Sequence, residues 1–290
     1  MLKPGPDAIC LSRSRPEDPI IDHNQTILIA GRGRLPAVLA ERLLAAGTPL
    51  TVLSLPGSDQ SWPPAIQSGE ISLANWMQVL AGKRAEGWTR AVMAGGVGRP
   101  PAPEDCSCPV DFSGGDDDVL RQFIVCMEDE IGLTIVSAVE IAPDLVAHSG
   151  LLTARAPTGQ DRQDIRQGFQ HARAHGMHDA GQAAVVARRK CLGLEPAAGT
   201  DALLKSVAET LAWPGPPARR RGVLAKCRKP IQDHRIDIPT VGPSTVELAA
   251  AIGLAGIAIR SGEVILLDRE LSIRCADAHG LFIWSEKVSS

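Results

Sequence analysis

The fold is decided by residues 26–55, TILIAGRGRLPAVLAERLLAAGTPLTVLSL. The two ends of this stretch, 26–31 and 49–55, are short apolar runs rich in β-branched residues, which is typical of buried strands. Between them, residues 34–47 carry leucine and valine at helical spacing. A strand, a helix and a second strand in this order open a parallel α/β sheet. The stretch therefore predicts an α/β fold.

The same alternation continues along the chain to residue 147. A proline-rich segment at 100–109 interrupts it, and we interpret this segment as a loop because proline removes a backbone donor. The other elements predicted in this half are helices at 72–86 and 117–132 and strands at 89–96 and 133–141. We therefore predict an N-terminal α/β domain over residues 26–147.

A second α/β domain is predicted over residues 148–287, joined to the first by a short linker. Its predicted elements are helices at 160–175, 200–212, 244–253 and 270–280, strands at 183–195 and 222–227, and two strands within 256–268. Residues 1–25 contain several prolines and charges and no uninterrupted apolar stretch. This composition predicts a flexible extension and not a signal peptide.

Composition narrows the class of protein. The chain has 290 residues, 44% hydrophobic and 22% charged, which suits a folded protein with a substantial core. Its formal net charge of −3 argues against a general nucleic-acid binder, which needs a basic excess. The seven cysteines are scattered, as expected for reduced thiols. No run approaches the roughly 18 apolar residues of a membrane span, so we expect a cytoplasmic protein.

A glycine turn follows the first predicted strand. Gly31 and Gly33 stand between that strand and a helix whose first turn holds Pro36. Glycine lets the backbone approach an anion closely, and the free N–H groups of a helix start face it. Because Pro36 stands where a dinucleotide fingerprint has its third glycine, a phosphate site and an ordinary tight turn are both consistent with the pattern.

Three further clusters have alternative interpretations. Asp116–Asp118 begin a predicted helix, where one carboxylate serves as a cap, although three exceed that need and suit Mg²⁺ or a hydroxyl-rich ligand. His171, His175 and His178 share a face only if the helix passes Gly176, so a polar surface is favoured over a metal site. The basic run from Arg219 to Lys229 indicates a solvated segment, a phosphate site or contact with an anionic membrane.

The loop KPIQDHRIDIPTVG, residues 229–242, combines polar side chains with prolines that fix its path. Asp237 lies between Ile236 and Ile238, and Pro239 restricts the preceding residue to extended conformations. A carboxylate in such a partly apolar setting must be paired, hydrogen-bonded or bound to a metal. The loop is therefore a candidate for the reacting centre.

These motifs, in their order along the chain, resemble the LpxI family of UDP-2,3-diacylglucosamine pyrophosphatases of lipid A biosynthesis. The resemblance covers about residues 26–285. It is carried by IAGRGRLP, AGGVGRP, GGDDDVL, DAGQAAVV, AGTDALL, RRRGVLAKCRKPIQDHRIDIPTVGPSTVELAAAIGLAGI and GEVILLDRE. The sequence departs from the family pattern at Arg32 within the glycine turn, at Gly96, at Ala198 and in the QDHR form that places His234 beside the loop.

The resemblance implies hydrolysis of UDP-2,3-diacylglucosamine to UMP and 2,3-diacylglucosamine 1-phosphate (lipid X). It implies Mg²⁺ or Mn²⁺, which would assist attack of water on the α-phosphorus by neutralising charge and lowering the pKa of bound water. It also implies a lipid-linked UDP-sugar held in a cleft between the domains, a homodimer, and peripheral contact with the inner face of the inner membrane. The sequence leaves two alternatives open: a pyrophosphatase for another UDP-sugar or nucleotide, and a non-catalytic lipid-phosphate-binding protein.

The same resemblance suggests residue roles, because the family's essential acidic residue matches Asp237. We expect Asp237 as a metal ligand or general base, Asp201 as a second metal ligand, and Asp233 and Lys229 as further catalytic residues. The predicted substrate-binding residues are Gly31, Gly33, Gln182, Thr200, Asp201, Gln232 and Thr240.

Overall fold

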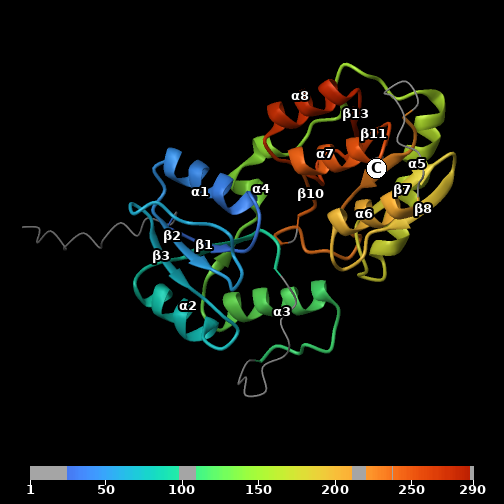
Figure 1. Cartoon of the computed structure of the whole chain (residues 1–290). Coiled ribbons are helices and arrows are strands. Elements are labelled where there is room, and N and C mark those ends of the chain that lie inside the picture. Colours follow the sequence, from blue (N-terminus) through green and yellow to red (C-terminus); the bar gives the residue numbers. More distant parts are fainter. Residues whose placement is uncertain (1–24, 98–108, 211–219, 237, 288–290) are drawn as a thin grey trace, which may run out of the picture.

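The computed structural model describes residues 25–97, 109–210, 220–236 and 238–287. The chain forms two lobes, each built around its own β-sheet, and this confirms the predicted pair of α/β domains (Figure 1). The predicted N-terminal extension, most of the proline-rich loop and Asp237 lie outside the described residues.

The N-terminal sheet has five parallel strands in the order β3-β2-β1-β4-β5. The predicted opening unit is confirmed as β1 (Thr26–Ala30), α1 (Leu35–Ala45) and β2 (Leu50–Ser54). The other strands are β3 (Gln67–Glu70), β4 (Arg90–Ala94) and β5 (Thr134–Ile135). Every residue of β1 is buried because helices cover both faces of the sheet, as is usual for parallel sheets.

Alternate residues of β1 divide the core of this domain between two helical layers. Leu28 packs in the same cluster as residues of α1 and of the short helix α4 (Ala138–Ile141). Ile27 and Ile29 pack on the opposite face, against α2 (Trp76–Ala85) and α3 (Asp116–Asp129). A 3₁₀ turn at Pro143–Leu145 leads out of the domain.

The predicted strand at 133–141 is wrong beyond Ile135. Ser137 accepts a hydrogen bond from the backbone N–H of Val139, and Glu140 accepts one from the backbone N–H of Ser137. This capping box begins α4, so local capping prevails over the apolar run that suggested a longer strand. Strand β3 was missed because its four residues are polar and exposed.

The C-terminal sheet has six strands in the order β6-β13-β11-β9-β7-β8. Its three central strands, β9 (Val223–Lys226), β11 (Gly256–Arg260) and β13 (Phe282–Glu286), are parallel. The outer strands, β6 (Gly150–Leu151), β7 (Ala183–Ala187) and β8 (Lys190–Leu194), run antiparallel to their neighbours. A two-stranded sheet of β10 (Thr240–Val241) and β12 (Ile265–Leu266) lies apart from it.

The single strand predicted at 183–195 is instead the hairpin of β7 and β8. Arg188 and Arg189 take left-handed backbone angles at its turn. Their backbone N–H groups donate to the Asp164 carboxylate at 3.0 and 2.7 Å. The carboxylate of a neighbouring helix therefore fixes a turn that lacks glycine.

Four helices cover this second sheet. One face packs against α5 (Gly159–Gly176), and the other against α6 (Thr200–Thr210), α7 (Pro243–Ala251) and α8 (Arg269–His279). Gly168 of α5 faces β9 so closely that an added Cβ would lie 2.5 Å from the Ala225 Cβ. Among the described residues, no helix combines the length and apolar character needed to cross a membrane.

Candidate functional site

The carboxyl ends of β1 and β4 mark the expected ligand position in the N-terminal domain. From β1 the chain builds β2 and β3 on one side of the sheet, and then places β4 and β5 on the other. Parallel sheets bind ligands at such a switch point, beyond the carboxyl ends of the two strands. In the C-terminal domain, Gln182 precedes β7 and its carbonyl accepts a hydrogen bond from the backbone N–H of Cys227, at the end of β9. These strand ends carry the residues that line two cavities.

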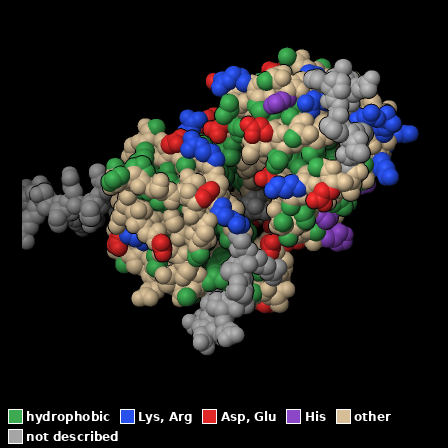
Figure 2. All heavy atoms as spheres, in the orientation of Figure 1, with side chains coloured by type: hydrophobic (Ala, Val, Ile, Leu, Met, Phe, Trp, Pro, Cys, Tyr) green, Lys and Arg blue, Asp and Glu red, His purple; other side chains and the backbone are tan. Residues whose placement is uncertain are grey.

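The two cavities lie between the lobes, where the surface is hollowed (Figure 2). The large cavity has a volume of about 1290 Å³ and the small cavity about 290 Å³. Five residues line both of them: Arg32, Met93, Gly95, Gly96 and Gln182. The cavities therefore meet at the loops that follow β1 and β4, opposite the start of β7.

The large cavity has an apolar wall built mainly by the N-terminal domain. Its lining includes Ile29, Leu55, Ile71, Trp76, Leu80, Met93, Phe112, Val119, Leu120, Phe123 and Met127. The C-terminal domain adds polar groups at the opposite side, including Asp179, Glu195 and Lys229. A ligand with long apolar chains and a polar head matches this division.

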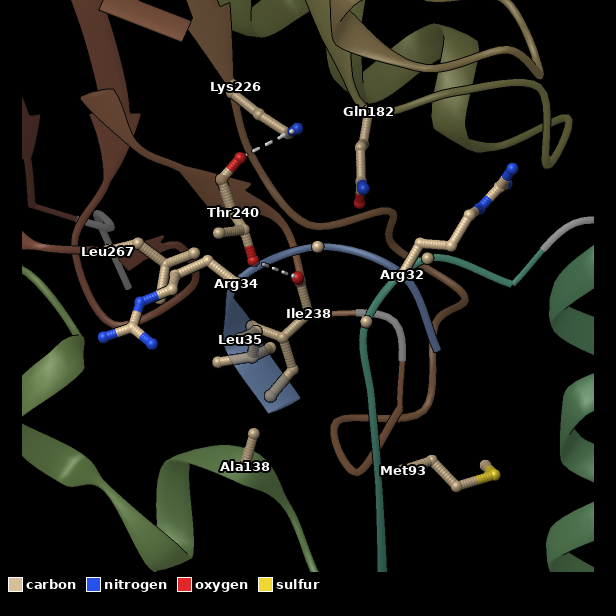
Figure 3. Close-up of a pocket in the computed structure, with 13 residues that line it drawn as sticks. Arg32, Arg34, Leu35, Met93, Ala138, Gln182, Lys226, Ile238, Thr240 and Leu267 are labelled. Atoms are coloured by element: carbon tan, nitrogen blue, oxygen red, sulfur yellow. Dashed lines mark hydrogen bonds between the residues drawn. The ribbon is translucent and has the colours of Figure 1, made fainter. Parts of the chain in front are cut away.

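The charged side chains that line the small cavity are all cationic (Figure 3). Arg32, Arg34 and Lys226 line it, and none of its described lining residues is acidic. Figure 3 shows Gln182 and Lys226 entering from the C-terminal domain, whereas Arg32 and Arg34 point in opposite directions from the loop after β1. The cavity therefore suits an anionic ligand.

The glycine turn is held against the loop after β4. Arg32 and Gly96 exchange two backbone hydrogen bonds, each 2.9 Å long. A Cβ at Gly31 would lie 2.7 Å from the Gly96 carbonyl oxygen, so this approach requires glycine. Gly33, with a φ of +90°, donates its N–H to Asp59 at 3.0 Å and lines the small cavity. The turn thus lies at the cavities, while one of the N–H groups expected to face an anion has an internal acceptor.

Lys229 lies between two carboxylates from different domains. Its Nζ is 2.7 Å from Asp179 Oδ1 and 3.2 Å from Asp117 Oδ1 in α3. Asp179 Oδ2 also accepts a hydrogen bond of 2.9 Å from the backbone N–H of Asp117. The first turn of α3 is therefore capped from the other domain, and the predicted catalytic Lys229 already has two counter-charges.

The Asp179 carboxyl is ionised by this arrangement. Burial raises its pKa, but hydrogen bonds from Lys229 and from the Asp117 backbone, together with the charge of Lys229, bring the pKa below its usual value. Asp179 has a left-handed φ of 54°, which aspartate tolerates better than most residues. The carboxylate is therefore fixed in position and charge.

A second buried group surrounds Thr200, a predicted substrate-binding residue. Thr200 Oγ1 donates to Glu195 Oε1 and accepts a hydrogen bond of 2.6 Å from Lys226 Nζ. Glu195 also accepts the backbone N–H of Gln182 at 2.7 Å. Burial raises the pKa of Glu195, but the charge of Lys226 and these hydrogen bonds lower it overall. The structure thus places Thr200 inside an ion pair behind the small cavity.

Three other predicted substrate-binding residues have clear positions. Gln182 lines both cavities, and its buried Oε1 has no hydrogen-bond partner among the described residues. Thr240 lines the small cavity and donates its hydroxyl to the Ile238 carbonyl at 3.0 Å. Gln232 is buried and does not line either cavity.

The predicted catalytic Asp233 is paired with Arg235. Arg235 Nη2 lies 2.8 Å from Asp233 Oδ2, and Arg235 Nη1 lies 2.7 Å from Glu128 in α3. Hydrogen bonds from Arg235 lower the pKa of Asp233, and this outweighs the effect of burial. Asp233 therefore takes part in a second ionic link between the domains, and its catalytic role stays a prediction.

The predicted metal-assisted mechanism needs correction. In the described ranges of the chain, no group of three or more His, Cys, Asp or Glu side chains is placed to share an ion. The carboxylates that converge beside the cavities, Asp117, Asp179 and Glu195, are instead paired with lysines. Asp201 lies exposed in the first turn of α6. The described residues alone do not form a metal centre, and the other predicted ligand, Asp237, lies outside them.

The structure also shows where two of the three clustered histidines, His175 and His178, lie. Helix α5 ends at Gly176, so His178 lies beyond it. His175 Nε2 is 2.8 Å from the Glu195 carbonyl oxygen, within hydrogen-bonding distance. Both side chains line the large cavity, where His175 is half-buried and His178 is exposed, as the favoured interpretation of a polar surface predicts for His178.

Sequence reasoning missed Glu195, Lys226 and Asp179 as members of the site. Lys226 was counted within a surface basic run, although its place at the end of an apolar strand indicates burial. Asp179 belongs to the DAGQAAVV motif, directly before β7, but the sequence contains no signal that it caps a helix 62 residues earlier.

Comparison with known proteins agrees with this architecture. The family model of the LpxI N-terminal domain matches residues 25–145, and that of the LpxI C-terminal domain matches residues 148–284. The chain belongs to the LpxI family. UDP-2,3-diacylglucosamine pyrophosphatase LpxI of Caulobacter vibrioides is 36% identical over 267 residues, which cover 88% of this chain and 95% of that protein. The LpxI domain matches place the two sheets in separate family domains, with the cavities between them.

Proposed function

We propose that the protein is an enzyme that hydrolyses the pyrophosphate bond of UDP-2,3-diacylglucosamine. Cleavage of this bond yields UMP and 2,3-diacylglucosamine 1-phosphate. The Caulobacter vibrioides relative bears this activity in its name and matches nearly its whole length to this chain. The single structural observation that supports the proposal is a large apolar cavity that meets a small cationic one.

The two cavities suit the two ends of this substrate. Removing acyl chains from water lowers the free energy by about 25 cal/mol per Å² of apolar area, so we place them against the apolar wall of the large cavity. The nucleotide phosphate is anionic and belongs in the small cavity, near Arg32 and Lys226. With its ends placed in this way, the pyrophosphate lies where the cavities meet.

The relationship to the LpxI enzyme of Caulobacter vibrioides argues against the two alternatives that the sequence left open. A pyrophosphatase for another UDP-sugar or nucleotide, and a non-catalytic lipid-phosphate-binding protein, would each require this chain to differ in activity from a relative that it matches over both domains. The large apolar cavity also argues against a substrate without acyl chains.

A purified-protein assay of UMP release from UDP-2,3-diacylglucosamine tests the proposal, with UDP-N-acetylglucosamine as the substrate without acyl chains. We expect turnover of the diacyl substrate and no turnover of UDP-N-acetylglucosamine. The need for Mg²⁺ or Mn²⁺ stays a prediction, which parallel assays with each ion and with chelator decide. Asp237→Ala is expected to abolish turnover, and Asp118→Asn, at an exposed residue of α3, is the control. A folded wild-type protein that releases no UMP under any of these conditions would refute the proposal.

We also propose peripheral contact with the inner face of the inner membrane, because the acyl chains of the substrate reside there. The basic run contributes less than its sequence suggests, since Lys226 and Lys229 are buried in ion pairs. Arg220, Arg221 and Arg228 are half-buried. Sedimentation with anionic vesicles at low and high salt tests the contact, and absence of binding at low salt would contradict it. The homodimer stays a prediction that light scattering can test.

A further inference from the structure

Arg32 occupies the boundary between the two cavities. It lines both of them and follows β1 at the switch point of the N-terminal sheet. Its backbone is fixed, because its N–H and carbonyl both bond to Gly96. The side chain therefore extends from a rigid support into the region where the reacting bond of the proposed substrate would lie.

The Arg32 guanidinium is available to a ligand, unlike the other cations of this region. It is exposed, and it forms no hydrogen bond or salt bridge with any described residue. Arg34 is bonded to Glu41 at 3.0 Å and points away from Arg32 (Figure 3). Lys226 is bonded to Thr200 and lies 3.6 Å from Glu195.

The charge of Arg32 acts on the pKa of one acidic side chain, that of Asp59. Hydrogen bonds from Gln60 and from the backbone N–H of Gly33 are the main reasons that the Asp59 pKa is lowered, and the charge of Arg32 contributes less. Asp59 thus already accepts hydrogen bonds from two other donors. The five N–H donors of the Arg32 guanidinium therefore have no fixed acceptor among the described residues.

Gln182 faces this boundary from the other domain. Its Oε1 is buried and has no hydrogen-bond partner among the described residues, while its backbone N–H and carbonyl are held by Glu195 and Cys227. A buried acceptor without a donor costs free energy, so a ligand that supplies an N–H or O–H is expected there. Together, a free cationic fork and a free acceptor match a phosphate next to a hydroxyl-bearing sugar.

We propose that Arg32 is a specificity-determining residue that binds the pyrophosphate of the substrate on its nucleotide side, opposite Gln182. The assignment rests on the proposed function. A planar guanidinium binds two phosphate oxygens at once, which a backbone N–H at this position cannot do. Arg32 thereby holds the nucleotide phosphate in the small cavity while the acyl chains occupy the large one.

Calorimetric titration with UMP and, separately, with uridine tests this assignment in the full-length protein. Arg32→Gln is expected to weaken UMP binding about fivefold to tenfold, as charge-assisted hydrogen bonds at an exposed site allow, and to leave uridine binding unchanged. Arg32→Lys should lose less than Arg32→Gln because it keeps the charge and loses only the fork. Arg42→Gln is the control, since Arg42 is an exposed arginine of α1 that pairs with Asp144 and lines neither cavity.

The outcomes separate this assignment from the proposed function. Equal UMP affinity in wild type and Arg32→Gln, or an equal loss for UMP and uridine, would overturn the role of Arg32 even if the enzyme turns over its substrate. A phosphate-dependent loss supports the role even if the diacyl substrate is not hydrolysed, in which case only the proposed function fails. In the active enzyme, Arg32→Gln is expected to raise KM by a similar factor and to weaken its dependence on salt.

Discussion

Asp179 in the C-terminal domain caps α3 of the N-terminal domain, through a 2.9 Å hydrogen bond from the backbone N–H of Asp117 to Asp179 Oδ2. The other Asp179 oxygen binds Lys229, which also contacts the Asp117 side chain. Figure 1 shows the start of α3 reaching toward the C-terminal lobe. The first turn of a helix that forms part of the apolar wall is therefore capped by a residue of the opposite domain.

Replacing Asp179 with asparagine tests the charge in this contact. Asparagine keeps the left-handed backbone and the cap, but it leaves Lys229 with one fewer counter-charge. We expect the free energy of unfolding to fall by about 1–2 kcal/mol in urea titrations. Asp118→Asn, in the same helical turn but exposed, should change it by less than about 0.5 kcal/mol. Equal effects of the two substitutions would contradict the interdomain cap.

Glu195→Gln should destabilise the protein at neutral pH, because it leaves the buried Lys226 without its counter-charge. Breaking a buried pair in this way costs about 3 kcal/mol. The comparison variant is Glu209→Gln, at an exposed residue of α6, and unfolding is followed by urea titration at pH 7. A loss no larger than that of the comparison variant would show that the pair contributes little.

The same variant should change how stability depends on pH. The folded-state pKa of Glu195 is lowered, so its contribution is complete above the unfolded value of 4.5 and is lost as the pH falls through the folded value. Unfolding of the wild type should therefore become easier below pH 4.5, and Glu195→Gln should lack that part of the slope. Parallel slopes in the two proteins would exclude this linkage.

The apolar wall is tested by two substitutions on α3. Val119 lines the large cavity, whereas Val125 is 48% exposed and does not line it. Val119→Glu places a carboxylate where acyl chains would remove it from water, and we expect KM for the diacyl substrate to rise about tenfold or more. Val125→Glu should stay within about twofold. Thermal unfolding of both variants checks the fold, and unchanged KM in a folded Val119→Glu would place the acyl chains elsewhere.

The link between Asp233 and Arg235 is open to a double-mutant cycle. Arg235 joins Asp233 to Glu128 of the other domain, and about one third of each of the Arg235 and Glu128 side chains is exposed. We expect Asp233→Asn and Arg235→Met each to reduce the free energy of unfolding, with a coupling of about 1 kcal/mol. Turnover measured in parallel distinguishes this structural role from catalysis. A loss of kcat in Asp233→Asn that Arg235→Met does not reproduce would favour a direct role for Asp233.

Much of the architecture was predictable because the spacing of apolar residues in the sequence matches the burial of the strands and helices that they form. The unit at 26–55 was found because buried parallel strands read as apolar runs and α1 keeps a clean helical spacing. The errors occurred where local bonds outweigh hydrophobicity, at the capping box of Ser137 and at the Arg188–Arg189 turn bonded to Asp164. Neither turn contains the glycine or proline that would have marked it.

Sequence motifs predicted several residues of the site, but they did not predict which residues these would contact. Gly33, Gln182 and Thr240 line the cavities, whereas Gly31 supports the turn beside them. The partners of Lys229 were not predictable, because Asp117 and Asp179 come from segments that only the folded chain brings together. The position of Asp237 lies outside the described residues, so its role stays a prediction.

The contact between Gly168 and Ala225 has a consequence for how this site can evolve. Gly168 brings the backbone of α5 against the Ala225 methyl group of β9, and Lys226 is the next residue along that strand. A single methyl group added at Gly168 would push against the strand and shift the ammonium that stands behind the small cavity. Natural selection for catalytic performance would thus also constrain Gly168, a helix position that lines neither cavity.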